Sequence, residues 1–348
     1  MLNLLLHLFM HPLRALHLSY TFVAQVILIL LGRIILPHYP AYQSLRLKLQ
    51  RAYLSSAVLT FPNLPHRLPI RHMPEHRAHK INEIPAYLVP GSSHLSSFRG
   101  QSPSVQRCVV LFAHGGGYAR GEARMYVTYM ERWINIAAQH RLDLAFVTVE
   151  YQLSTEEGHP AQMNAMVKSY QYLLDTGIRP QTIVFMGDSA GGGLSVLAAI
   201  ELKRLGLPQP AASVLISPWM DMTLSAWEGG NLAVETDYFV SANEAVPGLA
   251  ALFIRNHAPN SRDVNPLTQR SEDLTDLNPQ LIFVGAAEFA LYDSKQWASL
   301  CWAAGVKCSL NVEWGQLHVY ALGSKWTSPA VRTKTDNMII NWMKDHVN

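Results

Sequence analysis

Residues 185–193 read FMGDSAGGG, and this stretch decides the fold. It lies between an apolar strand-like run that ends at Met186 and an apolar helix-like run over residues 194–205. Ser189 therefore stands at a strand-to-helix turn within the pattern Gly-x-Ser-x-Gly, which is the context of a nucleophile elbow. The flanking glycines suit a turn in which neighbouring Cβ atoms would collide. We predict that Ser189 is a nucleophile at the start of a helix, where backbone N–H groups favour developing negative charge.

Strand-like and helix-like segments alternate along the chain on both sides of this turn. Apolar strand-like runs occupy residues 84–90, 108–113, 143–153, 182–186, 212–219, 279–288 and 307–314, and helix-like segments occupy residues 125–140, 160–177, 194–205, 294–305 and 331–347. Continuous apolar strands that alternate with helices indicate an α/β fold with a mostly parallel sheet covered on both faces. The alternation lapses between Trp219 and Pro279, which predicts an inserted lid.

A second glycine cluster, HGGG at residues 114–117, follows the strand-like run 108–113. Acyl transfer creates a negatively charged oxygen that needs N–H donors fixed in advance. Consecutive glycines let the backbone approach the substrate, so we predict that Gly116 and Gly117 donate to this oxygen together with Ala190. His114 precedes the serine and is interpreted as structural, because the chain order for this architecture is serine, acid, histidine.

The same chain order selects the general base. Only His257, His318 and His346 follow Ser189. His346 lies on a terminal amphipathic helix and is typical of a surface position, whereas His257 lies in the predicted lid and precedes the best acid candidates. His318 follows the last strand-like run, so we predict that it takes the proton of Ser189.

The acid of the triad has three candidates. Within the run 279–288 we expect the strand itself at Leu281–Gly285, and Glu288, the acid that we favour, lies three residues past it. Asp293 lies at the start of a helix, where a carboxylate is an ordinary capping group. Asp221 also follows a strand-like run. Either carboxylate type can hold the histidine tautomer and stabilise the imidazolium.

Composition excludes several other classes of function. Hydrophobic residues make up 49% of the 348 residues, which provides for a core and excludes global disorder. The net charge is +3 and the sequence has no long run of lysine and arginine, so it lacks the basic patch typical of nucleic-acid binding. The three cysteines match no metal or disulfide spacing, and we interpret them as reduced packing residues.

The first 37 residues are mostly apolar. Their uninterrupted part, Tyr20 to Gly32, is shorter than the roughly 20 residues of a spanning helix, although Ile34 to Leu36 extend it beyond Arg33. We therefore predict that residues 1–36 form a membrane anchor or a monotopic helix. The alternative is that they form helices that cover an active-site cleft. We expect no cleaved signal peptide, because no convincing small-residue cleavage site follows.

The ordered motifs resemble the hormone-sensitive-lipase-like branch of the α/β hydrolases. The matching segments are HGGG (114–117), VEYQLSTEE (149–157), GDSAGG (187–192), SPWMD (217–221), NPL (265–267), AAEFALYDS (286–294) and GQLHVY (315–320). This resemblance implies an α/β-hydrolase fold with a mostly parallel eight-stranded sheet and a helical cap. It also implies ester hydrolysis through an acyl-enzyme without a cofactor or metal, with Glu288 at the acid position where aspartate is usual.

Some positions depart from the family pattern. YQLSTE (151–156) lacks the usual arginine and proline, Ala165 stands where the family has aspartate, and Gly193 stands where asparagine is common. These changes surround the predicted site and leave the triad intact.

The expected function is hydrolysis of an apolar acyl ester. An acyltransferase or cyclase of natural-product metabolism with the same triad is the alternative, and a receptor without catalysis is disfavoured by the complete motif set. We expect residues 1–80 to form the apolar, membrane-associated segment and cap helices, and residues 81–348 the catalytic domain with a cap insertion at about 219–278. The apolar N-terminus also looks similar to that of fungal and animal microsomal deacetylases of this branch, and this resemblance implies association with a membrane of the endoplasmic-reticulum type.

Overall fold

The computed structural model describes residues 9–35, 73–100, 105–228, 242–325 and 327–348, together with residues 45, 48, 49, 52, 53 and 56. Its central feature is a sheet of eight strands in the order β1-β2-β4-β3-β5-β6-β7-β8. The strands are β1 (His79–Ile81), β2 (Ala86–Val89), β3 (Gln106–Ala113), β4 (Leu142–Val149), β5 (Ile183–Asp188), β6 (Ala212–Ile216), β7 (Gln280–Gly285) and β8 (Cys308–Glu313). β1 and β2 are antiparallel to their neighbours, and the pairs from β4 to β8 are parallel. The predicted fold class is confirmed.

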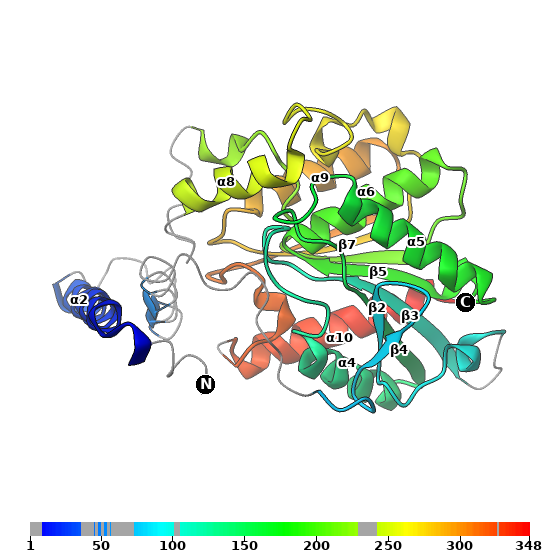
Figure 1. Cartoon of the computed structure of the whole chain (residues 1–348), viewed down its shortest axis with the longest axis horizontal. Coiled ribbons are helices and arrows are strands. Elements are labelled where there is room, and N and C mark those ends of the chain that lie inside the picture. The colour runs from blue at the N-terminus through cyan, green and yellow to red at the C-terminus, as the bar shows by residue number, and fades with distance from the viewer. Residues whose placement is uncertain are drawn as a thin grey trace.

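Helices cover both faces of this sheet (Figure 1). α5 (Ala161–Asp175), α6 (Ala190–Arg204) and α9 (Leu291–Ala303) pack on one face, and α4 (Val127–Gln139) and α10 (Pro329–His346) pack on the other. Successive side chains of a strand point to opposite faces, so β3 and β5 contribute buried residues to both hydrophobic layers. This two-sided burial explains why these strands are continuous apolar runs.

Parallel strands bring their carboxyl ends to one edge of the sheet, and this edge positions the candidate site. The glycine loop follows β3, Ser189 follows β5, Glu288 follows β7 and His318 follows β8. Segments that are more than 100 residues apart in the chain therefore meet.

Two elements differ from the sequence prediction. α6 begins at Ala190, four residues before the predicted start, because three consecutive glycines continue the helix where packing leaves no room for side chains. The four prolines of residues 61–80 predict an irregular connector, yet strand β1 begins at His79. It pairs only at the sheet edge, and its three residues carry little apolar signal. The sequence also predicts a helix over residues 38–53, with Leu45, Leu49 and Ala52 on one face, but most of this stretch lies outside the described residues.

The segment between β6 and β7 combines short 3₁₀ turns with one α-helix. It contains a short 3₁₀ turn at Ser225–Trp227, helix α8 (Ala242–Ile254) and 3₁₀ turns at Pro266–Thr268 and Ser271–Leu274. Residues 229–241 of this segment are outside the described part. Figure 1 shows α8 on the same side of the sheet as α6 and α9.

The N-terminal apolar segment forms one helix, α2 (Pro12–Ile35), of 24 residues. None of its residues is buried, and by length and composition it is able to cross a membrane. A signal sequence near the N-terminus has the same features. Figure 1 shows α2 apart from the sheet. In the described residues, α2 therefore does not cover the carboxyl edge.

Candidate active site

Ser189 occupies a sharp turn between β5 and α6. Its backbone has φ 51° and ψ −122°, a strained conformation for a residue with a side chain. The turn closes tightly because Gly191 packs against the end of β3, where an added Cβ would lie 2.1 Å from the carbonyl oxygen of Ala113. Glycine is therefore required there, and the close packing holds the serine in the strained conformation.

The predicted serine, histidine and glutamate form one hydrogen-bonded series. Ser189 Oγ lies 2.8 Å from His318 Nε2, and His318 Nδ1 lies 2.6 Å from Glu288 Oε2. Glu288 is fully buried, and His318 and Ser189 are 5% and 8% exposed. The carboxylate accepts at Nδ1, so this ring nitrogen carries a proton and Nε2 faces the serine hydroxyl as an acceptor.

The other two acid candidates contact the start of the segment after β6. Asp293 Oδ2 accepts from the N–H groups of Met220 and Asp221 at 2.8 and 2.9 Å. Asp293 lies in the first turn of α9, at the start of a helix as predicted, but Ala290 is the N-cap residue and the carboxylate bonds to the backbone of another segment. Asp221 accepts from Thr223, Ser225 and Asn265. The structure thus brings Glu288 to His318 and directs Asp293 and Asp221 elsewhere.

The glycine loop after β3 turns beside the serine. Gly116 and Gly117 have φ of 115° and 61°, and in the described residues their N–H groups donate to no other protein group. Ala190 is the first residue of α6, so its N–H has no acceptor within the helix. The three predicted donors therefore lie in the glycine loop and at the start of α6, and in the described residues no hydrogen bond to another protein group occupies their N–H groups.

Asp188 holds this loop in place, a role that the sequence analysis missed. Its Oδ1 accepts from Gly115 N–H at 2.8 Å, and its Oδ2 accepts from the Tyr126 hydroxyl at 2.9 Å. Burial raises the pKa of Asp188 to about 6, although both hydrogen bonds oppose this rise. The signal was the aspartate between Gly187 and Ser189, a charged residue in an otherwise apolar stretch.

His114 has the structural position that its place in the sequence predicts. Its ring stacks on Tyr151 with centroids 4.2 Å apart, and its Nδ1 lies 2.8 Å from the carbonyl oxygen of Gly115. His346 Nδ1 lies 2.8 Å from the carbonyl oxygen of Trp342, within α10.

Aromatic and apolar side chains lie beside the histidine and the glycine loop. Phe289 packs on the imidazole of His318 with ring centroids 4.7 Å apart, and Trp227 packs on Phe289 at 5.5 Å. Leu249 of α8 lies against Gly117, since a Cβ there would come within 2.6 Å of its Cδ1. The sequence places four aromatic residues, Trp219, Trp227, Phe239 and Phe253, in the predicted lid. Trp219 and Phe253 are buried, and Phe239 lies outside the described residues.

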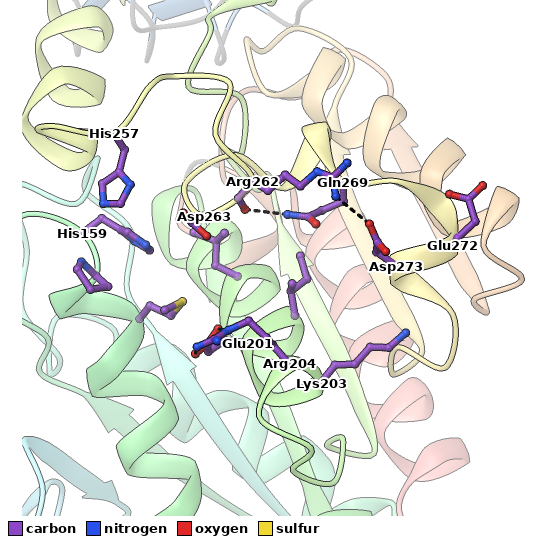
Figure 2. A pocket seen from close by; sticks show the side chains of 14 residues that line it. His159, Glu201, Lys203, Arg204, His257, Arg262, Asp263, Gln269, Glu272 and Asp273 are labelled. Atoms are coloured by element: carbon purple, nitrogen blue, oxygen red, sulfur yellow. Dashed lines mark hydrogen bonds and ion pairs between the residues drawn. The ribbon is translucent and has the colours of Figure 1, made fainter.

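A separate pocket of about 740 Å³ lies beside α5 and α6 (Figure 2). Charged side chains line it, including the Glu201–Arg204 and Arg262–Asp273 ion pairs. His257 lies here, with its ring centroid 5.2 Å from that of His159. Burial and the neighbouring His257 lower the pKa of His159 to about 4. None of the six predicted site residues lines this pocket.

Comparison with known proteins assigns the family. Residues 110–322 match a protein family described as having the alpha/beta hydrolase fold. The chain belongs to this family. A solved hormone-sensitive lipase from a metagenome library is 24% identical with a TM-score of 0.67, covers 92% of this chain and 98% of that one, and shares the fold.

Three other hydrolases are also similar to this chain. An esterase of Acinetobacter venetianus is 27% identical over 245 residues, which cover 70% of this chain and 78% of that protein. An acetyl-hydrolase of Streptomyces hygroscopicus is 31% identical over 214 residues, 61% of this chain and 67% of that protein. The structure of a mutant of the esterase E40 is 28% identical with a TM-score of 0.65 and covers 94% of this chain and 99% of that one. The prediction that the chain is a hydrolase enzyme is confirmed.

Proposed function

We propose that this α/β hydrolase is a serine esterase that cleaves apolar carboxylic esters through an acyl-enzyme. The observation that carries the proposal is the hydrogen-bonded series from Ser189 Oγ through His318 to Glu288. An esterase and an acetyl-hydrolase among its relatives support the same reaction class.

Acylation follows from the protonation state of this series. His318 Nε2 accepts the proton of Ser189 as the serine oxygen attacks the ester carbonyl carbon. Glu288 keeps the proton on Nδ1 and stabilises the imidazolium that forms. The imidazolium then donates its Nε2 proton to the departing alcohol, which leaves the acyl group on Ser189.

The tetrahedral intermediate places negative charge on the former carbonyl oxygen. Gly116, Gly117 and Ala190 supply backbone N–H donors for this oxygen, and the N-terminal end of α6 adds a favourable dipole. These donors belong to turns held by close packing and by Asp188, so little reorganisation accompanies the reaction.

Deacylation repeats these steps with water as the nucleophile. Hydrolysis and acyl transfer differ only in whether water or another alcohol attacks the acyl-enzyme. We propose hydrolysis, and adding an alcohol such as methanol to the assay tests this by the ratio of free acid to new ester. Acid as the main product in dilute alcohol supports hydrolysis, whereas predominant transfer at low alcohol concentration supports an acyltransferase.

The surroundings of the site favour an apolar ester. Phe289, Trp227 and Leu249 present aromatic and aliphatic groups beside His318 and Gly117. We propose that residues 219–278 form a cap over the catalytic domain 81–348, and that α8 closes the substrate site. A series of p-nitrophenyl esters of increasing acyl length measures how much chain this cap admits.

Helix α2 is proposed as a membrane-binding segment. At 1.5 Å per residue its 24 residues span about 36 Å, which exceeds the roughly 30 Å hydrocarbon core of a bilayer. Its large apolar side chains are exposed, and Arg14 and Arg33 lie near its two ends. A chain without residues 1–36 should become soluble, and full-length protein that is soluble without detergent would contradict membrane binding.

Covalent labelling tests the nucleophile directly. A fluorophosphonate probe should label the full chain at Ser189, and Ser189→Ala should abolish both labelling and ester hydrolysis. Ser195→Ala is the matched control, because Ser195 is a buried serine of α6 whose hydroxyl donates to the carbonyl oxygen of Gly191. Labelling that persists in Ser189→Ala would refute the proposal.

A further inference from the structure

Ser217 lies directly after β6 and contacts both the loop that carries Glu288 and the loop that carries His318. Its side chain is fully buried, and its backbone is left-handed with φ 48°. Its N–H donates to the carbonyl oxygen of Phe283 in β7 at 2.6 Å. The backbone of Ser217 is therefore anchored to the neighbouring strand independently of its side-chain contacts.

The Ser217 hydroxyl joins the two loops. It donates to Glu288 Oε1 at 2.7 Å and accepts from the N–H of Val319 at 2.9 Å. A carboxylate only accepts and a backbone N–H only donates, so the directions of both bonds are set. One hydroxyl thus ties the acid after β7 to the residue that follows His318.

We infer that Ser217 is a positioning residue of the reaction, an inference that rests on the proposed roles of Glu288 and His318. Glu288 Oε1 receives hydrogen bonds from Ser217 and from Gly285 N–H, and these bonds direct Oε2 toward His318 Nδ1. Through Val319, the same hydroxyl also holds the backbone that carries the imidazole. Loss of the hydroxyl frees both partners of the Glu288–His318 contact at once.

A merely structural role makes a different prediction. Any buried serine contributes stability through its hydrogen bonds, so a loss of stability by itself does not identify a positioning residue. Ser213 is the matched control because it is fully buried on β6 and its hydroxyl accepts from Asn278 Nδ2 at 2.7 Å. Ser213 lies at the other end of that strand from the site.

The positive φ of Ser217 provides a second variant. Alanine removes the hydroxyl but retains the strain of a left-handed residue, whereas glycine removes the hydroxyl and adopts this conformation readily. Ser217→Gly therefore keeps the test informative even where Ser217→Ala folds poorly.

The experiment measures kcat, KM and thermal midpoint for the full chain with p-nitrophenyl butyrate. Ser217→Ala and Ser217→Gly should each lower kcat by about ten- to a hundredfold with KM nearly unchanged, the range expected for a hydrogen bond to a charged group. Ser213→Ala should lower the thermal midpoint and leave kcat at the wild-type value.

Wild-type kcat in folded Ser217→Gly overturns the inference, as does an equal loss of kcat in Ser213→Ala. Glu288→Gln is measured in parallel to separate this result from the proposed function. Failure of Glu288→Gln to lower kcat refutes the proposed triad, whereas a large loss there together with active Ser217 variants refutes only the positioning role.

Discussion

Replacing Glu288 by glutamine should remove most of the catalytic rate while it preserves the shape of the site. Glu288 Oε1 accepts from the Ser217 hydroxyl at 2.7 Å and from Gly285 N–H at 2.5 Å. In the glutamine variant the amide oxygen takes this position, because an NH₂ group there would face two donors. The amide NH₂ then occupies the position of Oε2, 2.6 Å from His318 Nδ1, and donates to that nitrogen.

This exchange reverses the tautomer of His318. When Nδ1 accepts a hydrogen bond, Nε2 carries the proton and points it at Ser189 Oγ, so the imidazole is unable to take the serine proton. The corresponding change of acid to amide in a serine protease triad lowers kcat by about 10⁴-fold. We expect a loss of about 10³- to 10⁴-fold, or about 4 to 5.4 kcal/mol at 1.36 kcal/mol per tenfold.

The assay compares kcat and KM for hydrolysis of p-nitrophenyl butyrate, with folding checked by thermal unfolding. Asp293→Asn is the matched control, because Asp293 is also buried but its carboxylate accepts from the backbone of residues 220 and 221. An asparagine oxygen can accept both bonds, so kcat should stay within about threefold, an effect of under 1 kcal/mol. A large loss in Asp293→Asn together with a nearly active Glu288→Gln would refute the reasoning.

Two further predictions follow from the glycine loop and from a buried carboxyl. Gly117→Ala adds a Cβ within 2.6 Å of Leu249 at a residue with φ 61°, so it should displace the N–H donor and lower kcat/KM by about tenfold or more. Gly305→Ala is the control, because Gly305 has a similar φ of 72° but open space around it. An equal change of kcat/KM in both variants would contradict the proposed donor. Burial raises the pKa of Asp293 to about 7, so between about pH 4 and 7 the folded chain binds more protons than the unfolded chain and this carboxyl lowers stability as pH rises. Asp293→Asn should therefore lose less unfolding free energy than wild type between pH 5 and 8 in urea titrations, and equal losses would show that Asp293 does not titrate there.

Much of the fold was readable from the sequence because its signals are local. Continuous apolar strands, intervening helices and glycine turns predict the parallel sheet, and the structure and family comparison confirm it. The predicted start of α6 was four residues too late, because consecutive glycines are poor helix formers in isolation. They become helical here through packing against β3 and Trp219. Strand β1 was missed because its three residues gain their structure from pairing with β2.

In the candidate site, too, some residues could be predicted from local sequence patterns and others could not. Ser189 and the glycine loop carry local patterns, since a tight turn and close backbone approach restrict which residues fit. Among carboxylates the chain order left Glu288, Asp293 and Asp221 open, because position along the chain does not specify which side chain points toward His318. Only the tertiary structure decided this, by placing the loops after β7 and β8 side by side and turning Asp293 of α9 toward the backbone at Met220. Direction in space depends on packing between distant segments, and for that reason the sequence determined the chemical groups while the fold determined which of them meet.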